Sequence, residues 1–265
     1  MGTSASSKGP GFGVSFDPPW LQEIEVPNQN ESKTSNDESP QWIAPKARFG
    51  SSRRLLGDYL RTGNRDSVRR SLGHYSKTGM GGSRNVGQRM RTSAKAASGL
   101  YNTFSALRDD NSFSFGRELL SLKEQGANAD QIIDAIVKHV CPDGGSIDEI
   151  SCRDSGTAAL SEFMDHNPEA DFFNLSDDQI WTLTALFLGN EIFNRIQIDI
   201  GQVFEKTSVP YVDRVTRLND MRDYICSEVT SQLNQLRESI YQRVDMDKLF
   251  QKIIKNTFDV FEVEV

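Results

Sequence analysis

Few residues in this chain have the types and spacing that catalysis requires. Of the three histidines, His74, His139 and His166, only His139 lies near a potential nucleophile, two positions before Cys141. Cysteine–histidine catalysis also needs a third group that holds the base against the thiol, and the sequence indicates none. Cys141, followed by Pro142, is more typical of a small buried residue at a helix end. We therefore expect a non-enzymatic protein.

The acidic and glycine-rich motifs give equally weak evidence for a ligand. Asp148, Glu149 and Asp154 are close in sequence, but the first two occupy positions typical of acids that cap a helix. The Gly-Met-Gly-Gly segment at 79–82 could bind an anion through backbone N–H groups, although a simple connection between helices is the favoured interpretation. No metal and no bound cofactor are predicted.

Gly2 has the clearest potential for chemistry. Methionine aminopeptidase accepts a small second residue, so the mature chain should begin with a free glycine amine. Such an amine has an unperturbed pKa of about 8, so about a tenth of it is neutral and nucleophilic at pH 7. The Met1-Gly-x-x-x-Ser6 pattern also fits N-myristoylation, which is a weak motif. Gly2 is therefore our candidate modification site.

Residues 1–47 are predicted to form a disordered N-terminal tail that presents this amine. The segment is rich in Gly, Ser and Asn, and its apolar residues follow no period. A disordered tail of this length reaches about 40 Å on average, far enough to enter the active site of a separate enzyme. Thr3, Ser4 and Trp20 are the tail residues that we expect a partner to recognise.

The next zone of the chain is strongly basic. Residues 48–95 contain ten arginines and two lysines against two aspartates, whereas residues 96–265 have a net charge of −14. The basic zone could contact the acidic part of its own chain, an acidic partner or nucleic acid, and binding to phosphates would weaken steeply with salt. The candidate contact residues are Arg53, Arg54, Arg69, Arg70, Arg84, Arg89 and Arg91.

Apolar spacing predicts an all-α fold throughout the remaining chain. Residues 48–110 should form a basic helical segment, with two short helices and a longer one from Ser83 to Leu107. Residues 111–258 should form an acidic helical domain, in which three capping-box patterns mark helix starts. These patterns begin at Asn128, Ser146 and Ser176.

The apolar repeat near the end of the acidic domain predicts a long helical hairpin. In the helix after Pro210, nine apolar residues from Val212 to Ile240 recur every 3.5 positions on average, which indicates lengthwise packing on another helix. Helix 177–206 is the obvious antiparallel partner, and self-dimerisation through the same seam is the alternative. Residues 259–265 are predicted to be a C-terminal tail. Its last five residues, 261–265, alternate with period two and could pair as an edge strand on a partner, although a frayed end is the favoured interpretation. The fold is therefore a helical bundle with a long C-terminal hairpin.

The same sequence features indicate where the protein acts. No run of about 18 apolar residues is present, so no membrane span is expected. The N-terminus lacks the features of a secretory signal, and the three cysteines are too few for a disulfide framework. A cytoplasmic location is therefore predicted.

Several short motifs resemble the QatB family of the bacterial Qat anti-phage defence systems. They are spread along the chain in the expected order, and none is a catalytic signature. They are Met1-Gly-Thr-Ser4, Pro19-Trp20-Leu21, Gly82-Ser83-Arg-Asn85 with Arg89-Met90, and Cys141-Pro-Asp-Gly-Gly-Ser-Ile-Asp-Glu149 with Arg153-Asp154.

This resemblance implies a non-catalytic subunit with defined partners. They are a QatA-like ATPase, the QueC-like enzyme QatC and the TatD-like nuclease QatD. QueC-type enzymes adenylate a deazaguanine carboxylate that a nitrogen nucleophile then attacks, so the Gly2 amine is expected to be conjugated to a 7-deazaguanine. The alternative is a nucleic-acid-binding module in which residues 48–95 present DNA to the nuclease.

Overall fold

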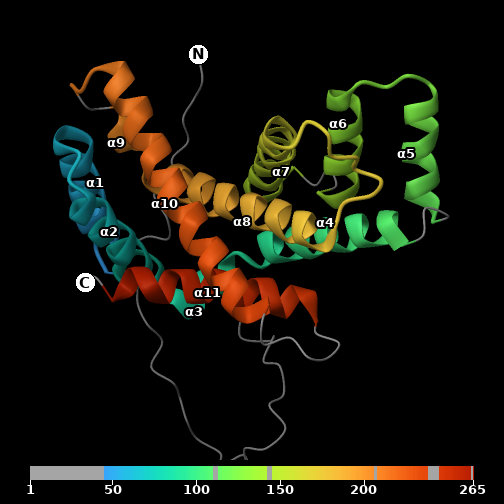
Figure 1. The fold of residues 1–265 in the computed structure, drawn as a ribbon. Coiled ribbons are helices and arrows are strands. Elements are labelled where there is room, and N and C mark those ends of the chain that lie inside the picture. Colours follow the sequence, from blue (N-terminus) through green and yellow to red (C-terminus); the bar gives the residue numbers. More distant parts are fainter. Residues whose placement is uncertain (1–44, 110–112, 142–144, 206–207, 238–244, 264) are drawn as a thin grey trace, which may run out of the picture.

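The computed structural model describes residues 45–109, 113–141, 145–205, 208–237, 245–263 and 265. Every regular element in these residues is helical, which confirms the predicted all-α class (Figure 1). No described helix is long and apolar enough to cross a membrane. The elements are α1 (Gly50–Thr62), α2 (Arg65–His74), η2 (Tyr75–Met80), α3 (Ser83–Arg89), α4 (Arg91–Asp109), α5 (Ser114–Glu124), α6 (Ala129–Val140), α7 (Ile147–His166), α8 (Asp177–Ile200), α9 (Gln202–Glu205), α10 (Tyr211–Arg237) and α11 (Met246–Glu262).

The three predicted capping boxes are all present. Asn128, Ser146 and Ser176 each accept a hydrogen bond from the backbone N–H three residues ahead, and the side chain at that position reciprocates. These reciprocal bonds satisfy two backbone donors that a helix start would otherwise leave unpaired. The starts of α6, α7 and α8 are therefore determined by local sequence.

Helices α8 and α10 form the predicted antiparallel hairpin. Arg237 at the end of α10 pairs with Asp177 at the start of α8, with 2.7 Å between Nη2 and Oδ2. Near the middle, Gly189 lets the helices approach closely, because a Cβ there would lie 2.5 Å from the sulfur of Cys226. Met221, Ile225, Val229 and Leu233 of the α10 seam are buried, Leu236 is partly buried, and Ile240 lies outside the described residues.

The first turns of α10 depart from the predicted seam. Val212 is 72% exposed and Val215 is 36% exposed, although both belong to the apolar repeat. Helix α8 ends at Ile200, and the beginning of α10 extends past it (Figure 1). These apolar positions therefore lie beyond the helix that covers the rest of the seam.

The C-terminal prediction needs a correction. Helix α11 does not end at 258 but continues to Glu262, so the residues up to Glu262 are neither the frayed end that the sequence favoured nor the edge strand of the alternative. Phe250, Ile254, Phe258 and Phe261 are all fully buried at helical spacing. Burial of this apolar face outweighs the period-two alternation at the end of the chain.

In the basic segment, two helix boundaries differ from those predicted from the sequence. The single helix expected from Ser83 to Leu107 is divided at Met90 into α3 and α4. Gly79, expected in a loop, belongs to the π-helix η2, where a Cβ would lie 2.4 Å from the Phe49 ring. The turn itself is at Gly81 and Gly82, whose φ angles of 82° and 104° favour glycine.

The basic segment packs on the acidic helices of its own chain, which was one of its three predicted partners. Helices α2, α3 and α4 lie along α11, and α4 also contacts α8 (Figure 1). Residues of both segments, such as Leu56, Phe104, Phe187 and Phe258, belong to one hydrophobic cluster. The basic and acidic parts therefore share a core.

Candidate functional site

The predicted tail residues cannot be placed in the structure. Gly2, Thr3, Ser4 and Trp20 lie outside the described residues, because the description begins at Pro45. Their roles in modification and partner recognition remain predictions. The sites that can be described belong to the helical body.

The predicted contact arginines divide into two groups. Arg54, Arg70 and Arg84 are exposed to solvent. Arg53 instead points toward α8, where its Nη2 donates a hydrogen bond to the backbone oxygen of Asp199 across 2.9 Å. The other three, Arg69, Arg89 and Arg91, are partly buried, and Arg69 lies over the ring of Tyr224. Composition identified the basic segment, but it could not separate these two groups.

Part of the exposed group forms a basic patch around His74. Burial lowers the pKa of His74, and the charges of Arg70, Arg54 and Lys77 lower it further. This shared effect shows that the three cations, from α1, α2 and η2, lie within electrostatic reach of one imidazole. We call these four residues the His74 patch. It is a surface that phosphates or carboxylates could contact.

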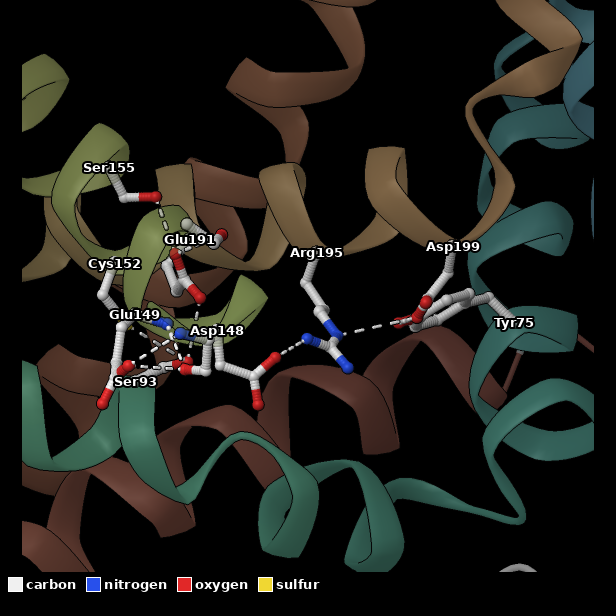
Figure 2. Close-up of polar contacts among 11 residues, drawn as sticks. Tyr75, Ser93, Asp148, Glu149, Cys152, Ser155, Glu191, Arg195 and Asp199 are labelled. Carbon is white, nitrogen blue, oxygen red and sulfur yellow. Dashed lines mark hydrogen bonds and ion pairs between the residues drawn. The ribbon is translucent and has the colours of Figure 1, made fainter. Parts of the chain in front are cut away.

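Arg53 contacts a polar network on α8 through Asp199. Glu191, Arg195 and Asp199 recur every four positions along this helix, and Figure 2 shows them in a row between α7 and η2. The guanidinium of Arg195 pairs with Asp148 of α7, and its Nε lies 3.7 Å from Oδ2 of Asp199. Tyr75 donates a hydrogen bond to the same oxygen across 2.8 Å. Its pKa is raised well above the usual value, mainly by burial and then by the Asp199 charge.

Glu191 is the most deeply buried charged residue of this row. Only 1% of it is exposed, and its two oxygens accept hydrogen bonds from the hydroxyls of Ser93, Ser151 and Ser155 at 3.0, 2.8 and 2.7 Å (Figure 2). The hydroxyl bonds lower the pKa of Glu191, but burial has the larger effect and raises it. The carboxyl group therefore joins α4, α7 and α8 through one buried centre.

The sequence interpretation missed this network. Helix α8 was analysed for its apolar stripe, which is buried as expected. The available signal was the set of charged residues at i, i+4 and i+8 inside the most apolar helix of the chain. Such a row places three ionisable groups on one helix face, where burial requires partners.

The structure does not bring His139 and Cys141 together as a catalytic pair. The His139 ring stacks on Phe115 with 3.8 Å between centroids. Cys141 is buried and shares a hydrogen bond with the thiol of Cys152, which lowers the pKa of Cys141. Cys152, by contrast, has a raised pKa because of that bond and its burial.

Two of the three acids near Cys141 make structural contacts. Glu149 caps α7 as predicted, whereas Asp148 pairs with Arg195. Asp154 is exposed. Within the described ranges, no group of three or more histidines, cysteines or acids could hold a metal ion.

These features define an all-α protein in which a basic segment folds onto acidic helices through a buried polar network. The family model described as Qat anti-phage system associated protein QatB matches residues 81–261, and the chain belongs to this family. The matched range runs from the turn before α3 to the last turns of α11, so it includes Glu191, Arg195 and Asp199. No curated protein and no solved structure matches the chain. The resemblance in the sequence motifs is therefore confirmed at the level of the family.

Proposed function

We propose that the protein is a non-catalytic subunit of a Qat-type anti-phage complex and that its Gly2 amine is conjugated to a 7-deazaguanine. The observation that supports this function is the family match over residues 81–261, whose description is that of a system-associated protein. The Met1-Gly2 start of the chain supports the modification. In this proposal the helical body docks on the system's ATPase and the N-terminal segment supplies the reacting amine.

The proposed reaction is an acyl transfer in which the protein is the substrate. The QueC-like partner QatC uses ATP to convert the carboxylate of a 7-deazaguanine to its adenylate, and pyrophosphate leaves. The neutral Gly2 amine attacks the carbonyl carbon, the bond to AMP breaks, and the nitrogen loses a proton as the amide forms. Glycine has no side chain to obstruct this attack, and about a tenth of an unperturbed α-amine is neutral at pH 7.

Co-expression with the QueC-like partner tests this reaction. Intact mass should show loss of Met1 and addition of one deazaguanine acyl group, and fragmentation should place the added mass on Gly2. The Lys8→Arg variant is the control for modification of the nearest lysine amine and should be modified like the wild type. A protein that shows only methionine loss, or a label on Lys8, would contradict the proposal.

The His74 patch supports a second candidate function, which is nucleic-acid binding by residues 48–95 to present DNA to the TatD-like nuclease QatD. The charges of Arg54, Arg70 and Lys77, from α1, α2 and η2, all lower the pKa of His74. Phosphate contacts of this kind provide affinity without reading sequence. Binding of duplex DNA by the whole protein, measured at several salt concentrations, tests this candidate.

A further inference from the structure

Helix α7 carries apolar side chains on two opposite faces. Its buried face, which includes Cys152, Ala159 and Phe163, packs on α4, α6 and α8 (Figure 1). The opposite face also begins with large apolar side chains, because Ile147 is 52% exposed and Ile150 is 45% exposed. We call the exposed positions on this side the α7 outer face, and they are Ile147, Ile150, Asp154, Thr157, Ala158 and Asp165.

The spacing of the α7 outer face is that of a helix that packs lengthwise on another helix. Ile147, Ile150, Asp154 and Thr157 follow one another at steps of three, four and three residues. Exposed aliphatic side chains with polar residues around them are typical of a surface that binds protein. The occupant that fits this face is therefore an α-helix.

The charge of the α7 outer face determines the chemistry of that helix. Asp154 and Asp165 are exposed, and within the described ranges neither forms an ion pair. The two acids are separated by about three helical turns, or about 16 Å along the helix axis. Such a face is complementary to aliphatic side chains that are flanked by lysine or arginine.

The same charge argues against an occupant from this protein. Residues 1–44 contain six acidic and two basic residues, so their net charge has the same sign as that of the α7 outer face. A second copy that used the same face would bring the aspartates of both copies into one interface, where like charges repel. A basic amphipathic helix of a separate protein avoids both conflicts.

We propose that the α7 outer face binds an amphipathic helix of a partner protein. Aliphatic side chains of that helix pack against Ile147 and Ile150, and lysine or arginine side chains lie beside Asp154 and Asp165. The inference rests on the proposed function, because the system's ATPase is the partner on which the helical body is proposed to dock. It does not depend on modification of Gly2.

Binding of the purified ATPase to the full-length protein tests this face. Affinity is measured at low and at high salt for the wild type and for two double variants, Ile147→Ser with Ile150→Ser and Asp154→Asn with Asp165→Asn. The serine variant should lose at least about tenfold in affinity, because the apolar anchors of the interface are truncated. The asparagine variant should bind more weakly at low salt and respond less to added salt, because its ion pairs are absent. Val212→Ser is the matched control, since Val212 is 72% exposed on α10, and it should bind like the wild type.

Each other result contradicts the proposal. Unchanged affinity in a folded serine variant would overturn the assignment of this face but leave docking on the ATPase in place. A wild-type protein that does not bind the ATPase would exclude both the docking and this face, whereas conjugation of Gly2 is judged separately by mass. An equal loss in Val212→Ser would indicate that apolar surface in general, and not α7, is responsible.

Thermal melting shows whether each variant is folded. If the serine variant is not, the asparagine variant decides the question alone, because it changes only exposed side chains to others of nearly the same size. Full affinity and an unchanged salt response in the asparagine variant would then overturn the proposal.

Discussion

Ser93 on α4 donates a hydrogen bond to Oε1 of Glu191 on α8 across 3.0 Å. This bond connects the basic segment to the acidic helices, and both partners are buried. The second oxygen of Glu191 is held by two serines of α7. A single carboxyl group therefore connects α8, which carries it, to α4 and α7 through hydrogen bonds.

The Glu191→Gln variant should have a flatter dependence of stability on pH. Burial raises the pKa of Glu191 in the folded state, so the folded protein binds the proton more tightly than the unfolded chain. This stabilisation is fully present below the unfolded pKa of a glutamate and is lost as pH rises through the raised pKa. Urea unfolding at a series of pH values should show this loss in the wild type only.

Glu149→Gln is the matched control, because its pKa shift has the opposite sign. Hydrogen bonds to Ser146 lower the pKa of Glu149, so its contribution is present above the unfolded pKa and lost as pH falls. Removal of Glu149 should therefore flatten the acidic side of the profile. Identical pH profiles for the two variants would show that the Glu191 carboxyl is not buried as described.

Gly189→Ala should separate the α8–α10 hairpin. The added methyl group would lie 2.5 Å from the sulfur and 2.9 Å from the Cα of Cys226, so backbone must move. Such overpacking costs about 1–3 kcal/mol of unfolding free energy. Gly57→Ala is the control in α1, where the nearest atom is at an ordinary 3.4 Å. The control should leave stability unchanged or raise it slightly, and equal behaviour of both variants would contradict the close approach.

Cys141→Ala should preserve phage protection. The Cys141 thiol is buried against Cys152, and His139 is stacked on Phe115. A plaque assay in cells that carry the complete system measures the effect, and thermal melting shows whether the variant is folded. Loss of protection by a folded, normally stable variant would show that Cys141 has a chemical role.

If the His74 patch binds duplex DNA, the Arg54→Gln, Arg70→Gln double variant should reduce the salt dependence of affinity. Each lost phosphate contact lowers the slope of log K against log salt by about 0.9. Because the pKa of His74 is lowered, binding should strengthen only as pH falls below the usual histidine range. Fluorescence anisotropy at several salt concentrations and pH values measures both effects. A wild-type protein that does not bind, or a double variant with an unchanged slope, would exclude this role.

The fold was largely predictable because its signals are local. Capping boxes fix the starts of α6, α7 and α8, and the 3.5-residue repeat identifies the hairpin. The divided helix at Met90 and the π-helix over Tyr75–Met80 were not predictable in this way. There the fold depends on contacts between distant residues, such as Gly79 with Phe49.

The polar network was harder to predict than the helices. Helical periodicity places Glu191, Arg195 and Asp199 on one face, but it does not reveal that Ser93, Asp148 and Tyr75 meet them. Those partners come from positions far away in the sequence. The arginine composition likewise predicted a basic surface, whereas Arg53 turns inward because α8 offers it an acceptor.

The shared core of the basic and acidic segments limits how the protein can be dissected. A fragment that ends near residue 110 would leave Tyr75, Phe104 and Leu56 without the neighbours that bury them. Its arginines would then lie on a scaffold that no longer holds them in place. DNA binding by such a truncated peptide would report only its charge, so point substitutions in the intact chain are the informative experiment.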